Sequence, residues 1–165
     1  MKNHTAFVAL GSNMENPEAN ILQAFFDLGA LPGTQLLARS SLYRSAPVEC
    51  DDPAEFINAV AKLATKLSPS ELMQALLEIE YRHGRRRRFR NQPRPLDLDL
   101  LSYDDIQLNQ PGLTLPHPRM HERAFVLLPL SEIAPDYRLD GQTRIDECLR
   151  NCSEQAIFRL SHAAQ

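Results

Sequence analysis

Seven arginines stand directly ahead of two aspartates in residues 82–101, the stretch of this chain with the strongest chemical character. The arginines are Arg82, Arg85, Arg86, Arg87, Arg88, Arg90 and Arg94, and the only acidic residues of the stretch are Asp97 and Asp99. Planar guanidinium groups bind phosphate oxygens in bidentate geometry. Mg²⁺ takes oxygen ligands, commonly one or two carboxylates together with substrate phosphates. The stretch therefore predicts a site for nucleotide-dependent phosphoryl-type transfer.

Asp97 and Asp99 belong to an alternating run, because residues 96–100 read Leu-Asp-Leu-Asp-Leu. Period-two alternation indicates a half-buried strand, on which successive side chains point to opposite faces. Both carboxylates would then share one face, where they repel each other unless a cation lies between them. A solvated strand face shows the same alternation, so the run by itself leaves metal ligation and plain solvent exposure as alternatives.

Charge is distributed unevenly along the chain. Seven of the 18 basic residues lie at 82–94, which leaves 11 basic against 21 acidic residues elsewhere, although the net charge is only −3. A local positive island suits a compact anionic ligand, whereas nucleic-acid binders usually spread their basic surface more widely. We therefore expect no nucleic-acid partner, but a nucleic-acid-binding module that uses residues 85–90 stays open as an alternative.

The composition indicates a soluble globular protein, since 43% hydrophobic and 24% charged residues are ordinary values for that class. The length of 165 residues fits one domain over residues 1–165. The sequence has no run of 18 apolar residues and no signal-peptide pattern. We therefore expect a cytoplasmic monomer with no membrane partner. Its three cysteines do not make a disulfide framework.

The order of the expected elements predicts the fold class. Apolar patterns predict strands at residues 5–10, 35–43, 56–65 and 96–100. One helix is expected from Pro17 to Gly29, with Asn16 as its N-cap, and another is expected after the capping box of Ser68 and Glu71. A third helix at 121–132 precedes a less regular tail. This order predicts a ferredoxin-like split βαβ core of the α+β class, with a mainly antiparallel sheet and extra C-terminal helices.

Short segments spread over about the first 137 residues share their order and sequence with a known family. They are Ala9-Leu10-Gly11-Ser12-Asn13, Ser41-Leu42-Tyr43-Arg44-Ser45, Phe56-Ile57-Asn58-Ala59, Ile79-Glu80, Gly84-Arg85, Pro93-Arg94, Leu96-Asp97-Leu98-Asp99, Leu115-Pro116-His117, Arg123 with Phe125, and Pro129-Leu130. The most specific is the pattern Pro-Arg-x-x-Asp-x-Asp at residues 93–99. On these segments the chain resembles the 6-hydroxymethyl-7,8-dihydropterin pyrophosphokinases, folate-pathway enzymes that make a pterin diphosphate from ATP.

The resemblance implies a role for individual residues. Asp97 and Asp99 would hold two Mg²⁺ ions that bridge the phosphates of ATP, and Arg85 and Arg94 would be catalytic with them. The residues that would contact ATP are Glu80, Arg85, Arg87, Arg90, Arg94, Thr114, His117 and Arg123. The residues that would contact the pterin are Ser45, Ala46, Val48, Phe56, Asn58 and Phe125. A flat ring with a polar edge does call for aromatic faces and an amide that donates and accepts.

The expected reaction is pyrophosphoryl transfer, in which the pterin hydroxymethyl oxygen attacks the β-phosphorus of ATP and AMP leaves. No strong base stands out in the sequence, so positioning and electrostatics would supply most of the rate. A nucleotidyl transferase, which would release pyrophosphate instead of AMP, is the second enzymatic alternative.

Overall fold

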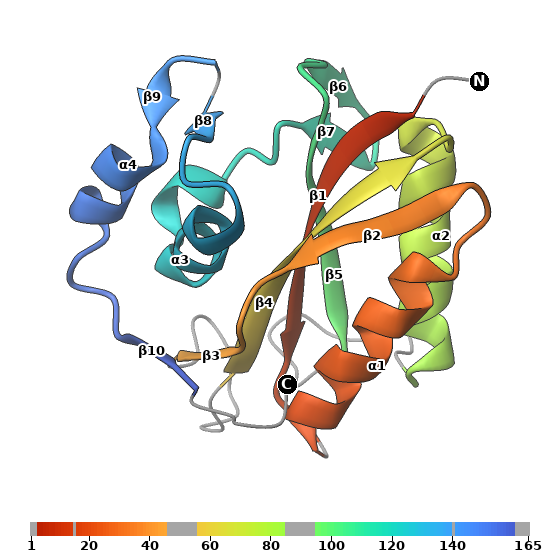
Figure 1. Cartoon of the computed structure of the whole chain (residues 1–165), viewed down its shortest axis with the longest axis horizontal. Coiled ribbons are helices and arrows are strands. Elements are labelled where there is room, and N and C mark those ends of the chain that lie inside the picture. The colour runs from red at the N-terminus through yellow and green to blue at the C-terminus, as the bar shows by residue number, and fades with distance from the viewer. Residues whose placement is uncertain (1–2, 15, 46–55, 85–94, 140, 161–165) are drawn as a thin grey trace.

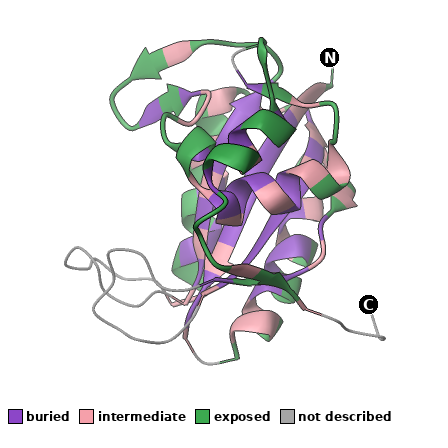
Figure 2. Ribbon diagram, turned by 90° about the vertical axis from the view of Figure 1, so that its left-hand side faces the viewer, coloured by how far each residue is buried: buried purple, intermediate pink, exposed green. Residues whose placement is uncertain are grey.

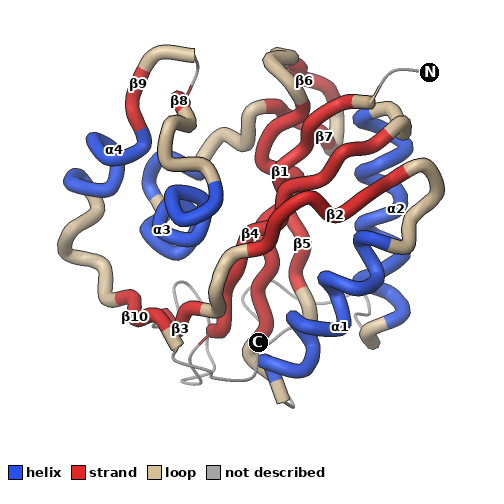
Figure 3. The backbone as a smooth tube through the Cα atoms, in the orientation of Figure 1, coloured by secondary structure: helices blue, strands red, loops and turns tan. Residues whose placement is uncertain are grey.

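A six-stranded antiparallel sheet forms the centre of the computed structural model, which describes residues 3–14, 16–45, 56–84, 95–139 and 141–160 (Figures 1 and 3). Five strands follow the order β10-β3-β4-β1-β5, and β2 also pairs with β4. The strands of this sheet are β1 (His4–Ser12), β2 (Thr34–Arg39), β3 (Tyr43–Ser45), β4 (Phe56–Thr65), β5 (Asp97–Tyr103) and β10 (Ile157–Arg159). With helix α1 (Pro17–Gly29) after β1 and α2 (Pro69–Arg82) after β4, this arrangement confirms the predicted α+β split βαβ core.

The two faces of the sheet bury two separate hydrophobic clusters. Helices α1 and α2 cover one face, where Leu98 and Leu100 of β5 pack among Val8 and Leu10 of β1. Helix α3 (Ala124–Ile133) covers the other face over Ala9. The helices lie on opposite sides of the sheet in Figure 1, and Figure 2 shows buried residues along the strands between them. The alternation at the start of β5 therefore has a physical cause, since Leu98 and Leu100 face one cluster and the two aspartates face the other side.

The local signals for α1 and α2 were correct except at one cap. Ser68 and Glu71 form the predicted capping box at α2, with the Glu71 amide donating to Ser68 Oγ over 3.1 Å. Helix α1 begins at Pro17 and ends at Gly29 as expected. Asn16 does not act as its side-chain N-cap, because its backbone lies in the left-handed region at φ 55° and its side chain makes no capping hydrogen bond.

One other prediction of secondary structure was wrong in detail. The single strand expected at residues 35–43 is two strands, because the chain leaves β2 after Arg39 and pairs again as β3 from Tyr43. The break falls at the polar residues Arg39, Ser40 and Ser41, and both β2 and β3 pair with the same strand, β4. A separate two-stranded sheet is formed by β6 (Leu108–Gln110) and β7 (Leu113–Leu115).

The tail after α3 has more regular structure than the sequence indicated. It contains a small hairpin of β8 (Arg138–Leu139) with β9 (Thr143–Arg144), helix α4 (Ile145–Asn151) and strand β10. The helix predicted at 121–132 is a 3-10 turn, η1 (Met120–Glu122), followed by α3. Because β10 pairs with β3 and α4 packs into the cluster under α3, the tail completes both the edge and one covered face of the sheet.

Glu132, on the last turn of α3, ties that helix to the segment between β2 and β3. Its carboxylate accepts hydrogen bonds from the Tyr43 hydroxyl at 2.6 Å and from the Ser41 amide at 3.0 Å. The Ser41 hydroxyl donates to the same group over 3.0 Å. Burial opposes the charge, but these hydrogen bonds outweigh it and hold the pKa of Glu132 below its ordinary value of 4.5.

We expect Glu132→Gln to lower the free energy of unfolding by about 1–3 kcal/mol at neutral pH, because an amide cannot accept all of these hydrogen bonds. The difference from the wild type should shrink as the pH falls below 4.5, since the unfolded chain then takes up the proton first and the stabilisation by the carboxylate is lost. Urea unfolding at several pH values measures both effects.

The matched control for this experiment is Glu122→Gln, which removes an acid that is 51% exposed and paired with Arg119 at 3.9 Å. Such surface pairs contribute about 1 kcal/mol at most. A Glu132→Gln variant as stable as this control at every pH would contradict the anchoring role.

Candidate active site

The two aspartates of β5 lie on one face of the sheet, as the alternation predicted. Asp97 and Asp99 are half-buried, whereas Leu98 between them is 2% exposed and points into the opposite cluster. Two oxygen-rich side chains on one face, two residues apart, match the hard ligands that Mg²⁺ prefers. The donor set of this strand therefore fits the predicted metal.

A row of directly paired residues connects these carboxylates to the residues predicted to bind a pterin. Asp97 of β5 pairs with Gly11 of β1, and Gly11 pairs on its other side with Asn58 of β4. Asn58 pairs in turn with Tyr43 of β3. Directly opposed residues of antiparallel strands project from the same face. The predicted metal pair and the predicted pterin amide thus lie on one face at the same end of the sheet.

Asn58 is 4% exposed and is held by its neighbours. Its side-chain amide nitrogen donates to Ser45 Oγ over 2.7 Å, and Ser45 lies on β3 directly opposite Phe56 of β4. The structure therefore brings Ser45, Phe56 and Asn58 together, as expected of a pterin wall. A buried, hydrogen-bonded amide presents its polar atoms in one fixed orientation, which suits recognition of a flat polar ring edge.

Glu80, which the resemblance assigns to the ATP contacts, holds the strand of the two aspartates. It is on the buried face of α2, 3% exposed, and its carboxylate accepts the Leu98 backbone amide at 2.7 Å. Leu98 stands between the two aspartates, so this bond holds the backbone of β5 at the carboxylate pair. This contact gives Glu80 a role in positioning the strand, and its contact with ATP stays a prediction.

The start of β5 is held by residues for which the sequence predicted no role in the site. Asn20 of α1 donates to the carbonyl of Pro95 at 3.2 Å and also to Ser12 Oγ at 3.2 Å. The Ser12 hydroxyl donates to the same Pro95 carbonyl, and Ser12 is completely buried. Ser12, the last residue of β1, and Asn20 therefore fix the point where the chain enters the strand of Asp97.

His117 lies beside the same strand in a defined tautomer. Its backbone amide donates to the Leu101 carbonyl at 2.8 Å, and its Nδ1 accepts from the Arg119 amide at 3.2 Å, which leaves the proton of a neutral ring on Nε2. Burial lowers the pKa of His117, and Arg123 and Arg119 lower it further, whereas Asp97 raises it. The ring is thus neutral at neutral pH and can donate from Nε2, and it lies close enough to Asp97 for the two groups to interact electrostatically.

Arg123 and Phe125 flank the start of α3 and lie next to each other. The Arg123 guanidinium carbon is 5.6 Å from the centre of the Phe125 ring, and Phe125 packs partly against the cluster under α3. Gln155, in the tail, holds this turn in place. Its side chain accepts the Ala124 amide at 2.8 Å and donates to the Glu122 carbonyl at 2.7 Å. Nothing in the sequence linked residue 155 to the site.

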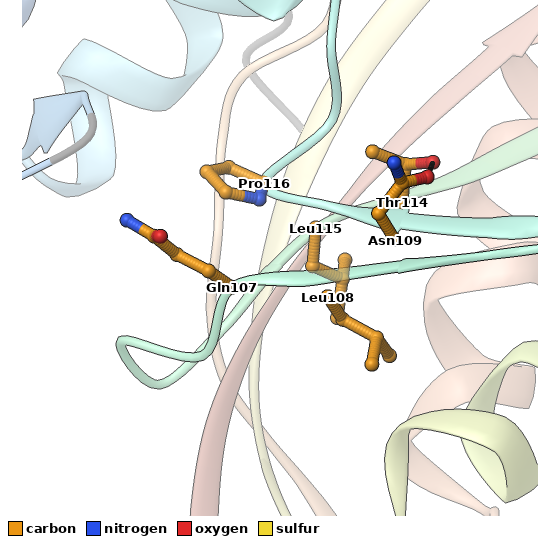
Figure 4. Close-up of a pocket in the computed structure, with 6 residues that line it drawn as sticks. All are labelled: Gln107, Leu108, Asn109, Thr114, Leu115 and Pro116. Carbon is orange, nitrogen blue, oxygen red and sulfur yellow. Dashed lines mark hydrogen bonds between the residues drawn. The ribbon is translucent and has the colours of Figure 1, made fainter.

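Thr114 lies apart from the row, on the two-stranded sheet of β6 and β7. It is exposed and lines a surface hollow of about 390 Å³ together with Gln107, Leu108, Asn109, Leu115 and Pro116 (Figure 4). Thr114 and Asn109 lie next to each other there, and their side-chain oxygens are 3.3 Å apart. The predicted ATP contacts are therefore divided between this hairpin and the face of Asp97.

Six of the predicted site residues lie outside the described part of the chain. They are Ala46, Val48, Arg85, Arg87, Arg90 and Arg94. Their assignments stay predictions from the sequence.

A model of the family described as 7,8-dihydro-6-hydroxymethylpterin-pyrophosphokinase matches residues 7–135. The similar curated proteins include the 2-amino-4-hydroxy-6-hydroxymethyldihydropteridine pyrophosphokinase of Pseudomonas aeruginosa, which is 44% identical over 95% of this chain and 97% of its own length. The corresponding enzyme of Haemophilus influenzae is 39% identical over 95% of this chain and 98% of its own length. The chain belongs to the 7,8-dihydro-6-hydroxymethylpterin-pyrophosphokinase family.

Solved structures agree on the fold. The chain is similar to a crystal structure of an HPPK-DHPS in complex with substrates, with a TM-score of 0.71 and 13% identity over 93% of this chain. It is also similar to the wild-type HPPK-DHPS of Plasmodium falciparum with SDX-DHP, with a TM-score of 0.72 and 14% identity over 91% of this chain. The chain spans 44% of the length of each of these two solved chains. At sequence identities this low, the structural similarity supports the assignment of the fold and nothing further.

We expect Glu80→Ala to lower the free energy of unfolding by about 1–3 kcal/mol, because it leaves the buried Leu98 amide without this acceptor. Urea unfolding measures the change. Glu78→Ala is the matched control, since Glu78 lies on the same helix and is exposed. An unchanged stability in Glu80→Ala would show that the carboxylate does not hold β5 and would return Glu80 to the role of a nucleotide contact.

Proposed function

We propose that this protein uses the row from Asn58 to Asp97 to transfer the diphosphoryl group of ATP to the hydroxymethyl oxygen of 6-hydroxymethyl-7,8-dihydropterin. The products are the pterin diphosphate of folate synthesis and AMP. The observation that carries the proposal is the strand register, which sets a buried amide and a carboxylate pair on one face with only Gly11 between them. The names of the family and of the similar bacterial proteins support the reaction.

The pterin is bound by the wall of Ser45, Phe56 and Asn58, with Ala46 and Val48 continuing it along the chain. Asn58 offers an amide held by the Ser45 hydroxyl, and aromatic faces at Phe56 and Phe125 suit a flat bicyclic ring. A ring without a polar edge would leave the buried polar groups of this wall without hydrogen-bond partners. The wall therefore discriminates strongly against such rings.

Asp97 and Asp99 would hold two Mg²⁺ ions, and their carboxylates supply only part of each coordination sphere, with phosphate oxygens of ATP completing it. When bound, Mg²⁺ neutralises phosphate charge and aligns the groups for an in-line displacement. Glu80 and the Ser12–Asn20–Pro95 contacts hold the strand that presents these carboxylates. The positions of the ligands are thereby set before the substrates arrive.

In the reaction, the hydroxymethyl oxygen forms a bond to the β-phosphorus, and the bond from that phosphorus to the oxygen bridging the α- and β-phosphates breaks. The electron pair stays on that bridging oxygen, which leaves as part of AMP, and the hydroxymethyl proton passes to solvent. Donors that stabilise charge on the phosphates are the neutral His117 Nε2 and the guanidinium of Arg123, joined by Arg85, Arg87, Arg90 and Arg94. Positioning and charge stabilisation supply the rate.

The catalytic unit is the single chain over residues 1–165, acting as a monomer in the cytoplasm. In the part of the chain that the structure describes, no helix is both long and apolar enough to cross a membrane. Sedimentation of the active protein at the mass of one chain tests the monomer.

We expect the purified protein to form AMP from ATP only when both Mg²⁺ and 6-hydroxymethyl-7,8-dihydropterin are present, and Asp97→Asn to slow this by at least about 100-fold. The loss follows from removing one charge of the carboxylate pair. Chromatography of the nucleotides over time measures the rate.

Asp105→Asn is the matched control, because Asp105 is an exposed acid in the turn after the same strand. Normal turnover in Asp97→Asn would overturn the metal assignment. Pyrophosphate in place of AMP would favour a nucleotidyl transferase, and salt-sensitive oligonucleotide binding without any AMP would favour a nucleic-acid-binding module.

A further inference from the structure

Gly11 stands in the middle of the row with no side chain between the amide of Asn58 and the carboxylate of Asp97. It is partly exposed, whereas its neighbours Leu10 and Ser12 are buried. Adjacent strands lie about 4.8 Å apart, so the backbones of Asn58 and Asp97 are separated by about 10 Å across Gly11. The face of β1 at this point is the floor between the two predicted substrate sites.

The backbone of Gly11 does not require a glycine. Four other glycines of the described chain have positive φ values, at positions 33, 84, 112 and 141, but Gly11 is not among them. A Cβ built on Gly11 would lie 3.5 Å from Asn58 Oδ1 and 3.9 Å from Phe56 Cδ1, which are ordinary van der Waals distances. Conformation and packing would therefore both accept an alanine here.

We infer that Gly11 lets the pterin lie in the orientation needed for attack, because its missing side chain leaves the floor of the site open to the pyrazine end of the ring. This inference rests on the proposed function. In a hydroxymethylpterin the polar pyrimidine edge and the hydroxymethyl group lie at opposite ends of the bicyclic ring. A ring whose polar edge meets Asn58 passes over Gly11 before its hydroxymethyl oxygen reaches a phosphate held at Asp97.

A methyl group at position 11 would occupy the space over which this ring lies. It would lift the ring from the sheet and move the attacking oxygen away from the line of displacement, and a misplacement of about 1 Å can cost on the order of 100-fold in rate. The nucleotide approaches from the side of Asp97, so its binding does not depend on the same space. A methyl group at position 11 should therefore impair the binding and turnover of the pterin and leave the binding of the nucleotide unchanged.

The test compares Gly11→Ala with the matched control Gly29→Ala. Gly29 ends α1, also has no positive φ, and its added Cβ would lie 3.4 Å from Leu36 Cβ.

We expect Gly11→Ala to melt within about 4 °C of the wild type. The variant should raise the KM for the pterin at least about tenfold and lower kcat on the order of 100-fold. Affinity for a non-hydrolysable ATP analogue with Mg²⁺, measured by calorimetry, should change less than about twofold, and Gly29→Ala should match the wild type in every assay.

Each outcome decides the matter. A wild-type protein that forms no pterin-dependent AMP would refute the proposed function itself. An active wild type with a Gly11→Ala variant of unchanged pterin KM and kcat would overturn the inference alone. So would a Gly11→Ala variant that unfolds or that loses the ATP analogue as well, because the inference requires a fold and a nucleotide site that accept the methyl group.

Discussion

The register of the central strand with its two neighbours is the constraint on which the site depends. Gly11 faces Asp97 on one side and Asn58 on the other, so a single strand sets the distance between a carboxylate pair and a buried amide. A shift of one residue would send every side chain to the opposite face. It would bury Asp97 against α1 and α2 and expose Leu98. The apolar clusters on both faces therefore hold the arrangement of the predicted site residues as well as the fold.

Side-chain contacts to the backbone then fix the strand of the aspartates more closely than pairing alone. Glu80 accepts the amide of Leu98, and Ser12 and Asn20 hold the carbonyl of Pro95. Two carboxylates on one face of a strand repel each other, so contacts from outside the pair help to hold the strand that carries them. Buried hydrogen bonds serve this purpose, because breaking one leaves a polar group without water.

The tail supports the site from the edge of the sheet opposite β5 and from the face that α3 covers. Strand β10 pairs with β3, which carries Ser45, and the side chain of Gln155 holds the turn that carries Arg123. The family model ends at residue 135, before both of these contacts. Together with the Glu132 contacts to Ser41 and Tyr43, the tail couples the pterin wall to the helix that covers it.

The sequence by itself determined the class of chemistry and the order of the elements. Alternating Leu and Asp residues placed both carboxylates on one face, and the capping box of Ser68 and Glu71 marked the start of α2, because these signals involve residues near one another in the chain. The sequence motifs also identified the family. The tertiary structure decided the break between β2 and β3, the left-handed backbone of Asn16 and the strands of the tail.

Tertiary structure also decided which residues meet. Glu80 contacts a backbone amide 18 residues away, Gln155 contacts residues more than 30 away, and Gly11 lies between Asn58 and Asp97. Such contacts depend on strand register and helix packing, which arise from the burial of two apolar clusters by the whole chain. Local sequence patterns do not predict such contacts. The positions of Gly11, Glu80 and Gln155 in the site were therefore decided by the tertiary structure.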